Sequence, residues 1–496
     1  MRETLVEPDE FLKLELVDLA DVSVDPVWSH ALPATGVRRY RALAICEVQH
    51  EVVVVTCNHR LDVVRNFVES RIRQPYRLVR AEENAFRDLL SHVFPPPALT
   101  AKADAHSETC ETVEVCDELM RAACLRGASD IHLVPEKSVL RTRFRVDGIL
   151  EDYRSCSIEL LNGLASRIKV LAGMNIAEKR EPQDGRFNYV DPVNQKPLDV
   201  RVATIPTRFG ERVTLRLLSP LHGTASFENL GMAPEQLELF TRAIKSSNGL
   251  ILLTGPTGCG KSTTLYTAIQ EVLRTRGGNV ITVEDPVEFE IPGTSQVEVD
   301  SSDKISFSRA LRSILRHDPD VIMLGEIRDA ETAEFALKAS LTGHLVFSTL
   351  HTNTASGVIT RLIDMGVEPF LIAATLRLAV AQRLVRKLCP KCRTPARLGT
   401  AMAASLGDPE LAGREAFEAS GCLYCAGKKF TGRIALFEML PGDSKVAELI
   451  SSGASETEIL EHMERSDHSL LLHDGIAKML SGTTTAEQVL NAVAMW

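Results

Sequence analysis

The segment from Gly255 to Ser262 is a glycine-rich loop that ends in a lysine and a hydroxyl group, with the sequence Gly-Pro-Thr-Gly-Cys-Gly-Lys-Ser. Glycines let backbone N–H groups converge on phosphate oxygens, while Lys261 can reach the β- and γ-phosphates and the Ser262 hydroxyl can ligate Mg²⁺. The sequence therefore predicts a nucleotide-phosphate site. We expect these residues to line it: Gly255, Pro256, Thr257, Gly258, Cys259, Gly260, Lys261, Ser262 and Thr263.

The segments on both sides of the loop supply the elements that such a site needs. The apolar run Leu250–Leu253 predicts a buried parallel strand before the loop. Apolar residues at helical spacing follow the loop and predict an amphipathic helix that ends near Gly277: Leu265, Ala268, Ile269, Val272 and Leu273. The N-terminus of that helix would meet the loop, where its dipole and unpaired N–H groups favour an anion. A chance match in a glycine-rich turn would not explain the flanking strand and helix.

Carboxylates follow two further apolar runs. Glu284 and Asp285 end one predicted strand, and such residues lie at the edge of an open α/β sheet where ligands bind. The run Val321–Leu324 is followed by Glu326, which is the layout of a Walker B strand. A carboxylate there can hold Mg²⁺ and orient the attacking water, so we predict that Glu326 is the water-polarising base. The alternative role, a helix N-cap, fits Asp329 better.

Two histidines, His344 and His351, bracket another apolar strand. A lone histidine is usually structural, whereas two beside a phosphate site suggest sensing or positioning. The pattern leaves both readings open.

Four cysteines form two C-x-x-C pairs, Cys389 with Cys392 and Cys422 with Cys425. Tetrahedral zinc binds four thiolates, and each pair presents two of them at a suitable spacing. The rival reading, two redox motifs, is weaker because such motifs normally occur singly on a thioredoxin-like unit. With four protein ligands no position stays open for a substrate, so we predict a structural zinc site that stabilises a segment too small to bury much core.

The composition limits the class of protein. The chain has 496 residues, of which 44% are hydrophobic and 25% charged, and its net charge is −10. These values are typical of a soluble protein with several domains, and the acidic balance argues mildly against a protein that coats nucleic acid. There is no apolar stretch of about 18–20 residues and no signal peptide at the acidic N-terminus. We expect a cytosolic protein that reaches a membrane only through a partner.

Composition and periodicity also predict the order of domains, with Pro95–Pro97 opening the clearest linker. We expect a small N-terminal α/β module for docking a partner, a linker, an α+β domain, a connector, an α/β nucleotide core, a tetracysteine subdomain and a helical region. Their predicted bounds are 1–94, 95–109, 110–220, 221–247, 248–385, 386–440 and 441–496.

The combination of motifs resembles the secretion ATPase superfamily, and especially the assembly ATPases of bacterial type II secretion and type IV pili. Those families carry a Walker A motif, an Asp box, a Walker B motif and a His box in the order seen here in Gly255–Ser262, Glu284–Glu288, Arg316–Asp329 and Ser340–Asn353. The segments Ser129–His132, Arg143–Gly148 and Gly210–Arg212 are similar to the domain before the ATPase core. The four cysteines, with Thr431–Arg433 after them, resemble the metal domain of assembly ATPases, which retraction ATPases generally lack.

The resemblance implies a RecA-like P-loop core that binds ATP and Mg²⁺ and hydrolyses ATP. It implies that Lys261 and Ser262 bind phosphates and Mg²⁺, that Glu326 is catalytic and that Glu284 assists it. Arg201 and Arg216 match arginines that reach the nucleotide from the preceding domain, and the two histidines match the His box: His344 and His351. The family forms hexameric rings that act on an inner-membrane platform and extend a pseudopilus or pilus. The N-terminal module would dock on the cytoplasmic domain of a membrane-anchored partner, which places the protein at the inner membrane as a peripheral protein.

Two departures and two alternatives accompany this resemblance. Cys259 stands where serine or alanine is more typical, which could make the site sensitive to thiol reagents. The N-terminal region matches loosely and is short, which favours type II secretion over pilus assembly. A nucleic-acid motor would use the zinc segment to bind DNA, but the acidic balance and the 5% aromatic content argue against it, and no direct contact with nucleic acid is expected. A nucleotide-binding scaffold without turnover is disfavoured by the intact Lys261, Glu284 and Glu326.

Overall fold

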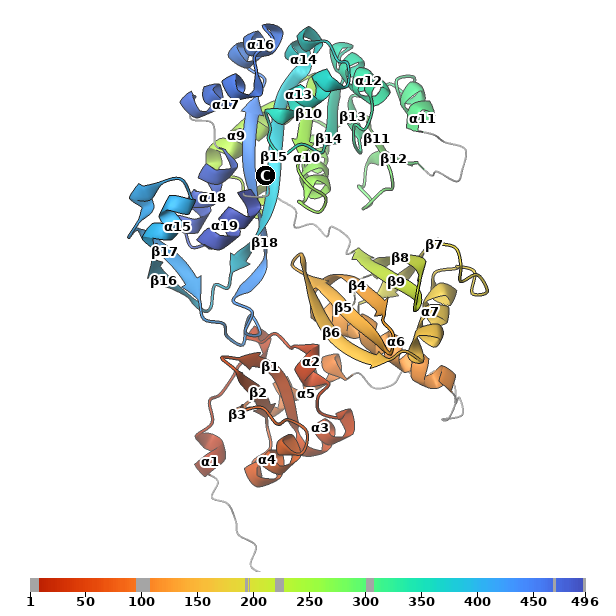
Figure 1. Cartoon of the computed structure of the whole chain (residues 1–496), viewed down its shortest axis with the longest axis vertical. Coiled ribbons are helices and arrows are strands. Elements are labelled where there is room, and N and C mark those ends of the chain that lie inside the picture. The colour runs from red at the N-terminus through yellow and green to blue at the C-terminus, as the bar shows by residue number, and fades with distance from the viewer. Residues whose placement is uncertain are drawn as a thin grey trace, which may run out of the picture. The chain divides into compact units, whose positions relative to one another are not determined.

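The computed structural model describes residues 9–94, 108–191, 195, 197–218, 227–299, 307–466 and 470–493. The chain divides into two compact units (Figure 1). The first contains residues 1–220, 388–394 and 419–431, and the second contains 221–387, 395–418 and 432–496. The predicted tetracysteine segment, 386–440, is thus shared between the units, and both cysteine pairs belong to the first.

The first unit begins with a three-stranded sheet in the order β1-β2-β3, with bounds Ala42–Val48, Glu51–Thr56 and Tyr76–Arg80. Strands β1 and β2 are antiparallel, and β3 is parallel to β2. The four consecutive valines of β2 are buried because helices pack around the sheet. These helices are α2 (Pro26–Ser29), α3 (Ala34–Tyr40), α4 (Leu61–Glu69) and α5 (Glu83–Val93), after a short α1 (Asp9–Leu12).

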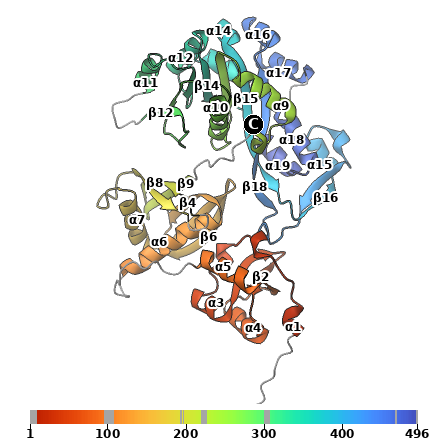
Figure 2. The same ribbon diagram turned by 180° about the vertical axis from the view of Figure 1, so that it is seen from behind.

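The second part of this unit is an antiparallel six-stranded sheet in the order β6-β5-β4-β9-β8-β7 (Figure 2). The bounds are Ile149–Ser157, Val139–Val146, Ala128–Pro135, Gly210–Leu218, Pro197–Thr207 and Gln183–Val190. Side chains alternate between the faces of a strand, and the apolar set of β5, including Leu140 and Phe144, packs under helices α6 (Glu108–Leu125) and α7 (Leu160–Leu171). The arginines of β5 lie on the opposite face.

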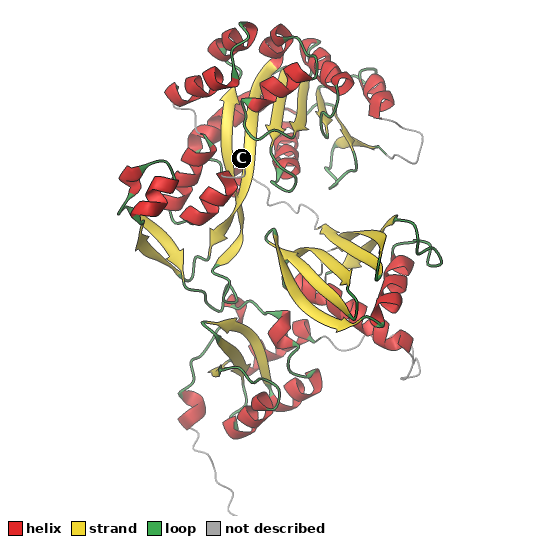
Figure 3. Cartoon of the chain, in the orientation of Figure 1, coloured by secondary structure: helices red, strands yellow, loops and turns green. Residues whose placement is uncertain are grey.

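The second unit is built on a seven-stranded sheet in the order β12-β11-β13-β14-β10-β15-β18. Figure 3 shows its strands in yellow and the helices around them in red. The bounds are Thr294–Glu298, Val280–Glu284, Val321–Leu324, Leu345–Leu350, Gly249–Thr254, Leu376–Leu388 and Phe430–Pro441. Neighbouring strands from β12 to β15 in this order are all parallel. The carboxyl ends of these strands therefore share one edge of the sheet.

Helices cover both faces of this sheet, which explains why its strands are continuous apolar runs. Leu250 and Leu252 of β10 face the core beneath α11 (Phe307–Ile314), α12 (Ala330–Leu341), α13 (Gly357–Asp364) and α14 (Pro369–Thr375). Ile251 and Leu253 face the opposite core, beneath α9 (Pro234–Ile244) and α10 (Lys261–Arg276). The predicted α/β class and parallel P-loop core are confirmed.

The C-terminal residues are helical, as their periodicity predicts, in α16 (Ser444–Ser451), α17 (Glu456–Arg465), α18 (Leu471–Leu480) and α19 (Ala486–Val493). The remaining short elements are α8 (Phe227–Leu230), β16 (Arg393–Arg397), α15 (Thr400–Ser405) and β17 (Glu415–Ala419). Across the described ranges, every helix is too short or too polar to cross a bilayer.

Candidate functional site

The phosphate loop connects β10 to α10, as the sequence predicts. Gly255, Gly258 and Gly260 have φ angles of +143°, +79° and +91°, which only glycine adopts without strain. A Cβ atom on Gly255 would also lie 2.5 Å from the carbonyl oxygen of Gln382. The glycines of the motif are therefore required by the shape of the loop. Pro256 and Thr257 are exposed beside them.

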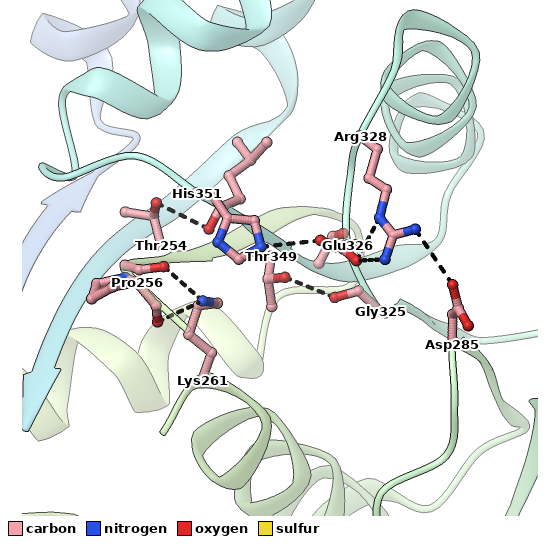
Figure 4. A network of polar contacts seen from close by, with 12 residues as sticks. Thr254, Pro256, Lys261, Asp285, Gly325, Glu326, Arg328, Thr349 and His351 are labelled. Carbon is pink, nitrogen blue, oxygen red and sulfur yellow. Dashed lines mark hydrogen bonds and ion pairs between the residues drawn. The ribbon is translucent and has the colours of Figure 1, made fainter. Parts of the chain in front are cut away.

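Lys261 is the first residue of α10, and its side chain folds back over the loop. Its Nζ atom donates to the carbonyl oxygens of Gly255, at 2.7 Å, and Pro256, at 3.2 Å (Figure 4). Burial lowers the pKa of the Lys261 amine. Ser262 follows with an exposed side chain, and Thr263 is half-buried. The loop thus holds a cation and a free hydroxyl at a helix N-terminus, which is the arrangement needed for a phosphate and its metal ion.

Glu326 lies directly beyond β13, where a tight link to β14 fixes the backbone. Thr349 donates from Oγ1 to the carbonyl oxygen of Gly325 at 2.8 Å. The two carboxylate oxygens of Glu326 have different partners: Nε of Arg328 donates to Oε1 at 2.6 Å, and Nε2 of His351 lies 3.0 Å from Oε2 (Figure 4). Burial alone would raise the pKa of Glu326, but Arg328 and His351 outweigh it, so this pKa lies below its usual value. Glu326 is therefore an ionised carboxylate at neutral pH.

The two carboxylates at the end of β11 have different surroundings. Glu284 is buried and accepts hydrogen bonds from Thr282 Oγ1, at 2.6 Å, Gln296 Nε2, at 3.1 Å, and the hydroxyl of Tyr266. Asp285 is exposed and pairs with Arg328 at 3.4 Å. The described contacts of Glu284 are those of a supporting residue beneath the site, and its catalytic role stays a prediction.

The structure separates the two predicted histidines. His344 precedes β14, and its Nδ1 atom lies 2.9 Å from the carbonyl oxygen of Ala339. His351 follows the same strand and contacts Glu326. A six-residue strand such as β14 spans about 20 Å, so only His351 lies at the phosphate edge of its own subunit. The predicted nucleotide contact of His344 has no support from this geometry.

Arg201 and Arg216 belong to the first unit and lie directly opposite each other on β8 and β9. Both lie on the face away from α6 and α7, because their neighbours Val200, Val202 and Leu215 fill the core. Nε of Arg216 donates to Asp130 at 3.1 Å. Nε of Arg201 lies 3.8 Å from Asp199, so each arginine has a carboxylate beside it. The reach of the two arginines to a nucleotide stays a prediction.

Sequence reasoning missed several residues of this site. Arg328 contacts both Glu326 and Asp285, a carboxylate that the sequence does place at this edge, and Tyr266 with Gln296 holds Glu284. A detectable signal was present for Tyr266, since it is the one aromatic residue in α10. Gln382 and Arg383 also touch the loop, and they interrupt the otherwise apolar middle of β15.

The four predicted cysteines come together as a metal site. The Sγ atoms of Cys389, Cys392, Cys422 and Cys425 all lie within 4.8 Å of one another. The Sγ atoms of Cys389 and Cys422 are 3.7 Å apart, and those of Cys392 and Cys425 are 3.9 Å apart. Four thiols at this spacing are a tetrahedral donor set for a soft divalent ion.

The comparison with protein families identifies the class. The model of the type II/IV secretion system protein family matches residues 105–491. The chain belongs to this family. It is accordingly an ATP hydrolase.

Curated relatives agree over most of this length. The type II secretion system protein E of Pseudomonas aeruginosa is 44% identical over 401 residues, which cover 79% of each chain. The type II secretion system ATPase E of Vibrio cholerae is 45% identical over 378 residues, 76% of this chain and 74% of that one. The type IV pilus assembly ATPase PilB of Thermus thermophilus is 43% identical over 375 residues, 75% of this chain and 42% of PilB.

Solved structures support the fold. The pilus retraction motor PilT with bound ADP is 27% identical, with a TM-score of 0.50, over 77% of this chain and 96% of PilT. The Legionella pneumophila ATPase DotB is 22% identical, with a TM-score of 0.56, over 80% of this chain and 98% of DotB.

Proposed function

We propose that this chain is the assembly ATPase of a type II secretion system, which hydrolyses ATP to extend a pseudopilus and so drive protein export. The observation that carries the proposal is the catalytic edge of the sheet, where the phosphate loop, Glu326 and His351 meet in one site. The relatives named for type II secretion, which match about three quarters of both chains, support the choice of system.

In the proposed mechanism, the loop holds the triphosphate through its backbone N–H groups and the Lys261 amine. The exposed Ser262 hydroxyl is placed to ligate Mg²⁺, which would neutralise charge on the β- and γ-phosphates. Glu326 orients the attacking water and takes its proton. Arg328 and His351 hold one side of each oxygen, and the remaining lone pairs of the carboxylate can accept the hydrogen bond of the water. Glu284 keeps the end of β11 in place beneath the site.

We assign the metal of the cysteine cluster as zinc. Four ligands at about 2.3 Å from a tetrahedral ion lie about 3.8 Å from one another, which matches the 3.7 and 3.9 Å separations. With all four positions taken by protein thiolates, zinc would hold the segment together and take no part in hydrolysis.

The proposal includes an assembly. A hexameric ring would bring Arg201 and Arg216 to a nucleotide, where two cations on neighbouring strands suit a polyphosphate. The N-terminal three-stranded module would dock on the cytoplasmic domain of an inner-membrane platform protein. The protein would then be cytoplasmic and peripheral at that membrane, without direct contact to nucleic acid.

Pilus assembly is the second candidate, and the identity to PilB of Thermus thermophilus is the observation in its favour. A nucleic-acid motor is the candidate from another class. The deciding experiment measures ATP turnover and mass of the purified chain, alone and with cytoplasmic domains of type II secretion or pilus platform proteins, or with single-stranded DNA. Turnover that rises with hexamer formation and with the secretion partner supports the proposal, whereas a rise only with the pilus partner or with DNA rejects it.

A further inference from the structure

Arg383 is a buried cation that makes no close ion pair within the described residues. The buried carboxylate of Glu438 acts on its charge only from a distance and accepts from the backbone of Ala355 and Leu471 instead. The Arg383 side chain belongs to β15 and is 4% exposed. Its guanidinium donates only to neutral oxygens, the carbonyl of Gln382 at 3.0 Å and the carbonyl and side chain of Asn353 at 2.9 and 3.3 Å. In the described ranges no carboxylate lies within ion-pair distance of it. A buried charge is costly unless it is paired, so its retention calls for an anion.

The position of Arg383 identifies that anion. In the register of β15 against β10, Ala381 lies opposite Thr254, which places the next two residues beside the start of the phosphate loop. The Nη1 atom of Arg383 lies 2.9 Å from where a Cβ on Gly255 would be. The guanidinium is therefore directly behind the loop, where the phosphates of the nucleotide bring negative charge.

The side-chain amide of Gln382 forms hydrogen bonds with the same loop and with the helix that follows it. Its side chain is 1% exposed and uses both ends of its amide. Nε2 donates to the carbonyl oxygen of Cys259 at 2.9 Å, and Oε1 accepts from Thr264 Oγ1 at 2.9 Å. One end thus holds the loop and the other holds the first turns of α10, so the amide fixes the loop relative to its helix.

Arg383 also connects the loop to the catalytic carboxylate. Asn353, which accepts from Nη2, lies two residues after His351, and His351 contacts Glu326. Between them, Thr352 donates its backbone N–H to Thr254 Oγ1 at 2.7 Å, directly before the loop. The segment after β14 is therefore tied to Thr254, just before the phosphate loop, at Thr352 and to Arg383 at Asn353.

We propose that Gln382 and Arg383 are positioning residues for ATP: Gln382 holds the phosphate loop in its binding shape, and Arg383 adds a second positive charge behind it. This inference rests on the ATPase activity and is independent of the secretion system served. Neither residue needs to touch the nucleotide.

The test compares the full chain with the variants Gln382→Met, Arg383→Met and Arg383→Lys. The matched control is Arg377→Met, which removes an arginine from the other end of the same strand. For each we measure Kd for ATP and for ADP, KM and kcat, and the thermal midpoint without nucleotide. We expect Gln382→Met and Arg383→Met to raise Kd and KM about tenfold or more, as for a lost charge-assisted or buried hydrogen bond. Arg383→Lys, which keeps the charge, should stay within about threefold, and Arg377→Met within about twofold.

The thermal midpoint separates positioning from a structural role. Because Arg383 is a buried charge that makes no close ion pair in the described ranges, Arg383→Met should leave the midpoint without nucleotide unchanged or raise it. A Kd within twofold of the native value in both methionine variants would overturn the proposal. So would a weakened Kd that comes with a lowered midpoint and is not restored by lysine. Should Arg383→Met not fold, that loss assigns Arg383 a structural role and rejects its part of the proposal, while Gln382→Met decides the other part.

Discussion

His351 Nε2 and Glu326 Oε2 lie 3.0 Å apart, so that residues beyond the ends of two neighbouring parallel strands meet at the phosphate edge. The other oxygen of Glu326 is occupied by Arg328. The carboxylate is thus held from both sides before any water is bound. This arrangement keeps Glu326 ionised and holds its side chain in one orientation, while the remaining lone pairs of its oxygens can accept a hydrogen bond from water.

Glu326→Gln should lower kcat by about 10²–10⁴-fold while ATP binding persists, because the amide keeps the shape of the side chain but cannot take a proton. Lys261→Ala should instead weaken ATP binding as well as turnover. Steady-state kinetics and equilibrium binding of ATP distinguish the two. Residual turnover above a tenth of native in Glu326→Gln would show that another group takes the proton.

Arg328→Gln should move the acidic limb of the kcat profile to higher pH. Arg328 helps to hold the pKa of Glu326 below its usual value, and activity is lost as pH falls through that pKa. Without the cation, the pKa rises and the loss begins at a higher pH. We would record kcat from pH 4.5 to 8. The control is Arg242→Gln, which removes an arginine from an exposed ion pair with Glu238 within one helix. If the acidic limbs of the native chain and Arg328→Gln coincide, Arg328 does not lower the pKa of the group that controls kcat.

Tyr266→Phe should destabilise the second unit by about 1–3 kcal/mol, because Glu284 would lose a buried hydrogen bond. The matched control is Tyr76→Phe, which removes the same hydroxyl from an exposed bond to Glu69 and should cost well under about 1 kcal/mol. Denaturant unfolding without nucleotide measures both. Equal effects would mean that Glu284 is not held by Tyr266.

Removal of the metal should open the segment around the second cysteine pair. The backbone carbonyls of Leu423 and Tyr424 accept hydrogen bonds from Ser23 in the same unit, at 3.1 and 2.7 Å. Chelation, or Cys392→Ser, should therefore expose Lys428 and Lys429 to trypsin. Metal analysis of the native chain should give one zinc per chain. Cleavage rates that do not depend on metal would refute the structural role.

Cys259 should resist alkylation in the folded chain, contrary to the thiol sensitivity that its place in the loop suggests. Its side chain is 4% exposed, and burial raises the pKa of its thiol. Mass spectrometry after brief treatment with iodoacetamide should show less label on Cys259 than on the more accessible Cys156. Equal labelling would restore the original hypothesis.

The parts of the site that could be predicted are those with a local signature. The strand, loop and helix around Lys261 are contiguous, and Glu326 follows its strand at once, so pattern and chemistry coincide. The cysteine pairs are equally visible in the sequence because each consists of two cysteines separated by two residues.

Other parts depend on partners that are distant in the sequence. Glu284 and Asp285 are adjacent, and only the pairing of β11 decides which of them is buried. His344 and His351 both flank one strand, but a parallel strand has only one end at the ligand edge, and the direction of β14 assigns it to His351. Gln382 and Arg383 carry no local sign of the loop that they touch.

The amide of Gln382 reaches Cys259 across 123 residues of sequence. During synthesis, the ribosome must therefore complete β15 before Gln382 can form its hydrogen bond with the phosphate loop. Until then the growing chain has the ATP-binding motif without its support, and ATP should bind the motif weakly. A fragment that ends before β15 should bind ATP more weakly than the full chain, so ATP affinity reports that β15 is in place.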